Sequence, residues 1–255
     1  MYRNTLAGVL TATALLASLA GAQQAPAPRT GPFNFIYVLT PKAGMTKQLE
    51  DGMKRHAAWH TQQKDQRGYS VSVVTAGDGV GQYRVVYGGL TLADQDAATP
   101  LMAGDLADVG TNIAPYLESM TSLVSTRNDS LSRIARTEPG KAMNSVTYVY
   151  LRQGKGAEYA EYLRRLKEAH EKAGSPFRYF VLNVAIGANL PALAIVRPMD
   201  KWADMTPAGN RAVLVQAFGQ PEADRLLNVI DDAVLRQVSF VSAGRPDLGY
   251  TPAGR

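Results

Sequence analysis

The chain has 255 residues, of which 45% are hydrophobic and 19% charged, a composition typical of a globular protein with a sizeable core. It contains no cysteine, which excludes disulfide bonds, a thiol nucleophile and thiolate ligands for a metal. The formal net charge of +5 is spread along the chain, and the one short basic cluster, residues 164–167, lies in a helical pattern. A solvated helix face explains that cluster, so nucleic acid is not an expected partner.

Residues 1–22 have the features of a cleaved secretory signal. Arg3 precedes an uncharged apolar run over residues 6–20, and an Ala-Gly-Ala tripeptide supplies a small-residue cleavage site before residue 23. The apolar run is shorter than the roughly 20 residues of a membrane-spanning helix. A Pro-rich linker follows over residues 23–32. We therefore expect a secreted or periplasmic protein without a membrane anchor once the signal is cleaved.

The rest of the chain contains an internal repeat. At an offset of 110 residues, residues 45–94 match residues 155–204 at nine positions, where chance would give roughly three or four. The matches used below are His60/His170, Tyr69/Tyr179, Gly77/Gly187 and, with one residue inserted in a loop, Tyr37/Tyr148. We therefore divide the chain into a first repeat, residues 33–139, and a second repeat with a C-terminal tail, residues 140–255.

Each repeat predicts the same series of elements. The strands expected in the first repeat are residues 33–39, 69–75, 82–88 and 130–137, and those in the second are residues 145–151, 179–185, 192–196 and 237–243. An amphipathic helix after the first strand carries an apolar stripe that ends in His60 or His170. Asp94 and Asp204 precede a second helical region, which prolines interrupt. The order β-α-β-β-α-β is ferredoxin-like.

The first strand of each repeat indicates how the two sheets would meet. Alternation places Tyr37 on one face in the first repeat, and Tyr148 and Tyr150 on the equivalent face in the second. The opposite face carries aliphatic residues, which suit packing under helices. We expect an α+β fold in which two tandem ferredoxin-like repeats form an intramolecular barrel-like pseudo-dimer, with these tyrosines between the sheets.

With this element order, the chain resembles the dimeric α+β barrel superfamily, and within it the NIPSNAP and antibiotic-monooxygenase-like groups. The resemblance covers about residues 33–250 and includes the segments Leu-Ala-Asp at 92–94 and Trp-Ala-Asp at 202–204. The closing Arg-Pro-Asp-Leu at 245–248 resembles exported tandem proteins of this type. The superfamily includes oxygenases, haem proteins, isomerases and binding proteins, so the resemblance implies a fold rather than an activity. It also allows a homo-oligomer.

Two pairs of histidines are candidate site residues. His56 and His60 are four residues apart on one helix face and could bind a metal together, but Ala57 stands where the zinc-protease motif has glutamate. We therefore expect ordinary helix-face histidines and no metal. His60 and His170 occupy matching positions, and each could simply form local hydrogen bonds. Alternatively, one of them lines a pocket or ligates haem, as a helix histidine does in the chlorite dismutase-like branch of the superfamily that the chain resembles.

The tyrosines of the predicted strands are the other candidates, either as core aromatics or as the lining of a cavity. The full set of expected ligand-binding residues is His60, His170, Tyr37, Tyr148, Tyr150, Tyr69 and Tyr179. Arg84 and Arg197, on third strands, are expected to be exposed, although they could neutralise an acidic ligand.

Our leading hypothesis is an exported protein that binds a small apolar or aromatic ligand between the sheets or in a helix–sheet cleft. One alternative is a cofactor-free oxygenase-like or haem-dependent enzyme that uses His60 or His170. Another is a protein-interaction module without a small ligand.

Overall fold

The computed structural model describes residues 31–136, 140–187, 189–206 and 209–253. The predicted signal and nearly all of the Pro-rich linker lie outside these residues. Within the described ranges, no helix is both long and apolar enough to cross a membrane.

The first half follows the predicted β-α-β-β-α-β order. Its strands are β1 (Phe33–Pro41), β2 (Ser70–Gly77), β3 (Tyr83–Leu90) and β4 (Leu117–Asn128). Its helices are α1 (Thr46–Gln63), α2 (Leu92–Ala98) and α3 (Met102–Asn112), with short 3-10 turns η1 (Thr99–Leu101) and η2 (Ala114–Tyr116). Pro100 and Pro115 occupy the 3-10 turns, so the predicted interruptions of this helical region are confirmed.

The second half repeats this order. Its strands are β5 (Met143–Leu151), β6 (Phe180–Ile186), β7 (Ala192–Met199) and β8 (Val234–Gly244). Its helices are α4 (Gly156–Lys172), α5 (Asn210–Phe218) and α6 (Gln220–Ala233), with 3-10 turns η3 (Trp202–Asp204) and η4 (Pro246–Leu248).

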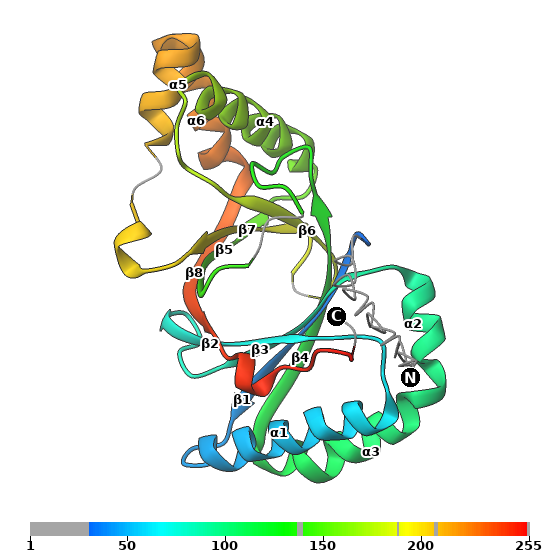
Figure 1. Ribbon diagram of the computed structural model, residues 1–255. Helices are drawn as coiled ribbons and strands as arrows, with labels where there is room; N and C mark the ends of the chain where they lie inside the picture. The colour runs from blue at the N-terminus through cyan, green and yellow to red at the C-terminus, as the bar shows by residue number, and fades with distance from the viewer. Residues whose placement is uncertain (1–30, 137–139, 188, 207–208, 254–255) are drawn as a thin grey trace, which may run out of the picture.

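The strands form one closed antiparallel barrel in the order β1-β3-β2-β8-β5-β7-β6-β4. Each half contributes a ferredoxin-like sheet with its fourth strand at one edge and its second strand at the other. The halves join where β8 pairs with β2 and where β4 pairs with β6. Helices α1 to α3 lie on one side of the barrel and α4 to α6 on the opposite side (Figure 1). The predicted fold class is confirmed.

Three apolar clusters form the core. One lies between α1, α3 and the first-half sheet, and includes Leu49 and Met53. A second lies between the second-half helices and their sheet, and includes Leu163 and Leu214. The third fills part of the barrel interior, where Phe240 packs among residues of both halves. The barrel interior and the two helix–sheet layers are therefore separate places in which a ligand could be held.

Two expectations about the strands are wrong. The last strand of the first half is β4, not residues 130–137: residues 130–136 form turns and bends, and residue 137 lies outside the described residues. The first part of β4 is exposed on both faces, so it lacks the alternating pattern on which the prediction depended. Tyr37 also does not correspond to Tyr148. Val86 lies opposite Ile36 as Val196 lies opposite Val146, so the 110-residue offset continues through β1 and β5 without an insertion.

Candidate functional site

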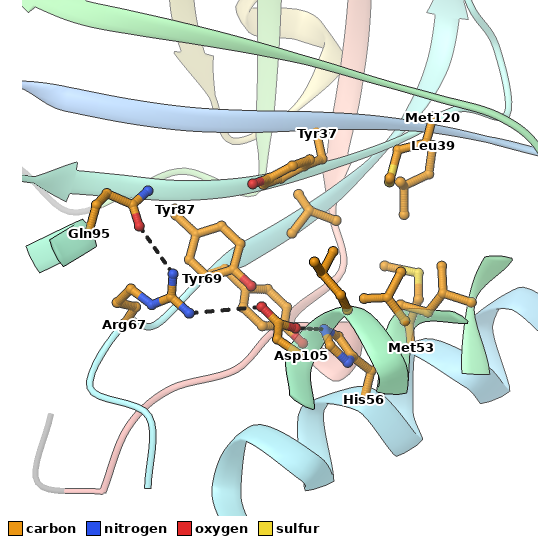
Figure 2. Close-up of a pocket in the computed structure, with 14 residues that line it drawn as sticks. Tyr37, Leu39, Met53, His56, Arg67, Tyr69, Tyr87, Gln95, Asp105 and Met120 are labelled. Atoms are coloured by element: carbon orange, nitrogen blue, oxygen red, sulfur yellow. Dashed lines mark hydrogen bonds and ion pairs between the residues drawn. The ribbon is translucent and has the colours of Figure 1, made fainter. Parts of the chain in front are cut away.

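A small cavity lies between α1, α3 and the first-half sheet. Its volume is about 120 Å³. Its apolar walls are formed by Leu39, Met53, Val85, Leu106, Val109, Ile113 and Met120. Tyr37, Tyr69 and Tyr87 add phenol rings, and polar groups from His56, Arg67, Gln95 and Asp105 complete the lining. Figure 2 shows Asp105 projecting from α3 between Arg67 and His56, below Tyr37 and Tyr87. The cavity thus joins an aromatic and aliphatic space to a concentrated set of ionisable groups.

His56 points from α1 toward α3. Its ring is almost fully buried, at 6% exposure. Its Nδ1 lies 2.8 Å from Asp108 Oδ1, and its Nε2 lies 3.4 Å from Asp105 Oδ1. Burial lowers the pKa of His56 below its ordinary value, although the hydrogen bond to Asp108 opposes the shift. His56 is therefore a neutral imidazole near pH 7.

His60 lies one helical turn further along α1, behind the cavity lining. It is fully buried, with its Nε2 3.1 Å from His56 Nε2 and its Nδ1 3.0 Å from Asp65 Oδ2. Asp65 reaches back to the ring because α1 ends at Lys64, which adopts a left-handed conformation with φ of 53°. The hydrogen bond between Asp65 and His60 thus depends on how the helix ends.

Asp65 is held as a buried carboxylate by two partners. Arg67 Nη2 lies 3.0 Å from Asp65 Oδ2, and the Arg67 backbone N–H donates to Asp65 Oδ1 at 2.9 Å. Burial opposes ionisation of Asp65, but the hydrogen bonds from His60 and Arg67 outweigh it and hold the pKa of the carboxyl well below its usual range. Arg67 also donates to Gln95 at 3.1 Å and lies 3.9 Å from Asp105 Oδ2. It therefore joins the buried Asp65 to the cavity.

The three tyrosines of the cavity are neutral phenols. Burial is the largest cause of the raised pKa of Tyr37, Tyr69 and Tyr87, and the charge of Asp105 adds to it. The Tyr87 hydroxyl lies 3.5 Å from His60 Nε2. These hydroxyls can donate a hydrogen bond to a ligand or accept one from it.

Gly52 allows α3 to approach α1 closely. A Cβ atom at Gly52 would overlap the carbonyl oxygen of Asn112, at the end of α3. Asn112 also accepts a hydrogen bond from Arg55 of α1 at 2.7 Å, and donates one to Asp108 at 3.0 Å. This close packing brings Asp105 and Asp108 within reach of His56.

The equivalent region of the second half is filled by side chains. At the offset of 110 residues, Tyr162 stands in place of Gly52, and Leu166 in place of His56, and both are buried in the core. His170 is fully buried, with Nδ1 2.9 Å from Ser175 Oγ and Nε2 3.2 Å from Asn210 Oδ1. The local hydrogen-bonding interpretation therefore describes His170.

The barrel interior holds the remaining predicted tyrosine site. An opening of about 420 Å³ there is lined in part by Tyr148, Phe240 and Arg84. The Arg84 guanidinium lies 4.0 Å from the Phe240 ring centre, and its Nη1 lies 3.4 Å from the Tyr148 hydroxyl. Arg84 therefore points into the barrel, and the expectation that it is exposed is wrong. The expectation that Arg197 is exposed is also wrong, because its side chain is partly buried, with the guanidinium 4.2 Å from the ring centre of Phe177.

The structure separates the predicted site residues. Tyr37 and Tyr69 line the first-half cavity, and His60 lies directly behind it. Tyr148 belongs to the apolar cluster in the barrel interior, and Tyr150 packs against that cluster. Tyr179 belongs instead to the second-half core. The expectation that Tyr37 faces the space between the sheets is therefore wrong, because its side of β1 faces α1 and α3.

Sequence reasoning missed most of the polar groups at the cavity. They are Asp65, Arg67, Tyr87, Gln95, Asp105 and Asp108. The spacing of Asp105 and Asp108, one turn apart on a helix, is a signal that could have identified a shared polar face. Nothing in the spacing indicates that this face meets His56, because that contact depends on tertiary packing.

No family model matches the chain, and no curated protein matches its sequence. In structure, it is similar to a monooxygenase-like protein from Lactobacillus acidophilus, with a TM-score of 0.50 and 8% identity over 87% of this chain and 97% of that one. It is also similar to two variants of chlorite dismutase from Candidatus Nitrospira defluvii. Their TM-scores are 0.53 and 0.51, with 10% and 9% identity, over 86% and 87% of this chain and 94% and 93% of theirs. The similarity shows the dimeric α+β barrel fold and not an activity.

The residues around the two candidate histidines do not fit a haem. The rings of His60 and His170 are fully buried, and both nitrogens of each already contact protein side chains. The cavity of about 120 Å³ beside His60 is also well below the several hundred Å³ of a site for even a drug-sized ligand. Neither His60 nor His170 is therefore suited to ligate a haem in this fold.

Proposed function

We propose that the protein binds a small aromatic molecule with one polar group in the first-half cavity. The observation that carries this proposal is the position of His56 and Asp105, with Arg67 and Gln95, at the polar end of a space whose other walls are aliphatic and tyrosine side chains. Apolar walls supply affinity and a few convergent polar groups supply orientation, which is the usual composition of a ligand site.

The size of the cavity limits the ligand to about one ring. An engineered apolar cavity of roughly 150 Å³ in another protein accommodates benzene. The cavity here measures about 120 Å³, somewhat less than that cavity, so its volume sets an upper limit of a single ring with one small substituent. Met53 and Met120, which line the cavity, have flexible side chains that allow a modest expansion.

The charge of the surroundings selects the polar group of the ligand. Three carboxylates and one guanidinium surround the paired imidazoles, which leaves an excess of two negative charges when both histidines are neutral. A carboxylate ligand would be repelled, whereas a phenolic hydroxyl can donate to Asp105 or to His56. We therefore expect a preference for phenols over benzoates.

One observation favours an enzyme as a second candidate function. His56 lines the cavity, and burial lowers its pKa, so its neutral ring could accept a proton from a bound phenol or an acidic C–H group. Proton abstraction of this kind is the step that a cofactor-free oxygenase requires of its protein. In this candidate enzyme the proton-accepting residue is His56, and not His60 or His170 as the sequence suggested.

The protein is proposed to act outside the cytoplasm, because residues 1–22 have the pattern of a cleaved signal. We also propose that it belongs to exported tandem members of the NIPSNAP and antibiotic-monooxygenase-like groups, because its repeat and its short segments resemble theirs. N-terminal sequencing of the protein from an exporting host is expected to begin at Gln23. Retention of Met1 on the exported protein would contradict the cleavage.

Calorimetric titration with phenol and with benzoate tests the ligand proposal. We expect saturable phenol binding at one site and little benzoate binding. Val85→Phe, which fills the cavity from β3, should reduce phenol affinity at least tenfold. Tyr148→Phe is the matched control, because it changes a tyrosine in the barrel interior and should leave affinity unchanged.

The two variants separate the two cavities. Phenol affinity lost in Tyr148→Phe but retained in Val85→Phe would move the site into the barrel and overturn the proposal. Equal binding of phenol and benzoate would contradict the electrostatic argument. Conversion of bound phenol that disappears in His56→Leu would establish the enzyme candidate.

A further inference from the structure

Three atoms that commonly bind metals converge behind the polar end of the cavity. They are His56 Nε2, His60 Nε2 and Asp105 Oδ1. The two nitrogens are 3.1 Å apart, and Asp105 Oδ1 lies 3.4 Å from the first and 3.7 Å from the second. Ligand atoms on a tetrahedral ion with bonds of about 2.1 Å are roughly 3.4 Å from one another. The three distances therefore surround the value that a bound ion would impose.

The outer nitrogens of the two rings determine what the inner nitrogens offer. His56 Nδ1 faces Asp108 at 2.8 Å, and His60 Nδ1 faces Asp65 at 3.0 Å. An ionised carboxylate can only accept a hydrogen bond, so each Nδ1 carries the proton and donates it. When both rings are neutral, their Nε2 atoms then present lone pairs to each other at 3.1 Å. A cation between the two atoms would relieve that repulsion.

The same carboxylates give the histidines the support typical of metal ligands. A histidine bound to a metal usually donates its other N–H to a carboxylate or carbonyl, which orients the ring and fixes its tautomer. Here both rings have such a partner, and the two partners come from different segments, α3 and the turn after α1. In addition, Asp105 Oδ1 is buried and accepts no hydrogen bond from the described part of the chain.

The charge of the cluster also favours a bound cation. Neutral rings leave an excess of two negative charges on the surrounding carboxylates after Arg67 is counted. A single shared proton would remove one of these charges, whereas a divalent ion would neutralise both. In a buried site water screens a remaining negative charge only weakly, so the divalent ion is the more favourable of the two.

We infer that His56, His60 and Asp105 bind one divalent first-row transition-metal ion. Two imidazoles and one carboxylate suit zinc, iron, manganese, cobalt or nickel, and imidazole ligands argue against calcium and magnesium. Three protein ligands leave coordination positions for water or a ligand, and His56 and Asp105 both line the cavity. The ion would lie at the polar end of the proposed phenol site. The inference shares that cavity but does not rest on the phenol, because metal binding is measured without it.

Titration of the chelator-stripped mature protein with Co²⁺ and with Zn²⁺ tests this inference. Native mass spectrometry should show one ion per chain, and the Co²⁺ form should develop visible absorption bands of a low-coordinate site. His56→Leu removes one ligand and Asp105→Asn removes the negative charge of another, so each should weaken binding more than 100-fold. Asp108→Asn leaves the ligands in place but removes an orienting carboxylate, so we expect a 10- to 100-fold loss.

His170→Gln is the matched control, because His170 is the equivalent residue of the second half and contacts neither the ligands nor their carboxylates. It should retain wild-type metal affinity, and far-ultraviolet circular dichroism should show that all four variants are folded. Absence of stoichiometric metal in the wild type would overturn the inference and leave a shared proton between the histidines. Equal binding by the wild type, His56→Leu and Asp105→Asn would overturn it too. Phenol binding that persists without metal would leave the proposed function intact, so the two failures are distinguishable.

Discussion

His60 and His170 lie in the last turns of equivalent helices. Both are fully buried, and each contacts the side chain five residues further along the chain. In the first half that side chain is Asp65, and the other ring nitrogen faces a second histidine. In the second half it is Ser175, and the other nitrogen faces Asn210. The backbone repeats as well, since the N–H of Asp65 bonds to His60 O at 3.1 Å and that of Ser175 to His170 O at 3.0 Å.

One local structure therefore serves two roles. With neutral partners, the buried histidine of the second half completes a filled core. With charged partners, the same position in the first half becomes part of a polar cluster beside a cavity. The difference shows that a histidine matched across a repeat does not indicate a shared function, and that the residues around it decide its role.

Replacing the two side chains that contact the histidines should give the largest difference between the halves. Asp65→Ala leaves the His60 N–H and the Arg67 guanidinium buried without their carboxylate, so we expect the free energy of unfolding to fall by about 3–5 kcal/mol. Ser175→Ala removes one neutral hydrogen bond and should cost about 1 kcal/mol. Urea denaturation of both variants measures the two losses. Equal losses would show that the charged network adds nothing to the stability of the first half.

The close approach of α1 and α3 should give the next largest effect. Gly52→Ala places a Cβ on the Asn112 carbonyl, which must move the helices apart at a cost of about 1–3 kcal/mol. The same movement should draw Asp105 away from His56 and weaken Co²⁺ binding. Gly110→Ala is the control on α3, because a Cβ there meets nothing within 4 Å. It should raise stability by about 0.5–1 kcal/mol. Co²⁺ binding unchanged in Gly52→Ala would contradict the positioning role of that packing.

The smallest expected effect concerns the pH dependence of the second half. Burial lowers the pKa of His170, against the hydrogen bond to Asn210, and the nearby charge of Arg133 adds to the shift. Ser175 and the stacked ring of Phe177 are its uncharged neighbours. Below about pH 6.5 the unfolded chain binds a proton that the folded chain refuses, so stability falls as the pH drops.

His170→Gln should remove that part of the pH dependence. Urea denaturation in the presence of a chelator, at about pH 7.5 and about pH 5.5, compares the variant with the wild type. The free energy of unfolding should fall less with pH in the variant. Identical slopes would show that His170 does not titrate differently in the folded and unfolded chains.

The sequence predicts the fold better than the site, for a physical reason. Strand alternation and the apolar stripes of helices are local patterns, so they predict most of the strands and helices. They also predict that the second half repeats the element order of the first. The sequence does not predict strand β4, because its exposed first residues lack alternation of apolar and polar side chains. The sequence predicts an ordinary helix-face histidine at His56, because Ala57 replaces the zinc-protease glutamate. The partner that changes this interpretation, Asp105, lies 49 positions away on a different helix. Contacts between elements, unlike the elements themselves, leave no periodic signal.

The two strand pairs that join the halves, β2 with β8 and β4 with β6, have a consequence for the folding of the newly made chain. When synthesis reaches the end of β4, the first sheet is complete but has two open edges, β2 and β4, whose partners β8 and β6 come later in the chain. Open strand edges invite pairing with other chains. The nascent protein therefore passes through a period of exposure to aggregation, which ends when the last strand, β8, joins β2 and closes the ring.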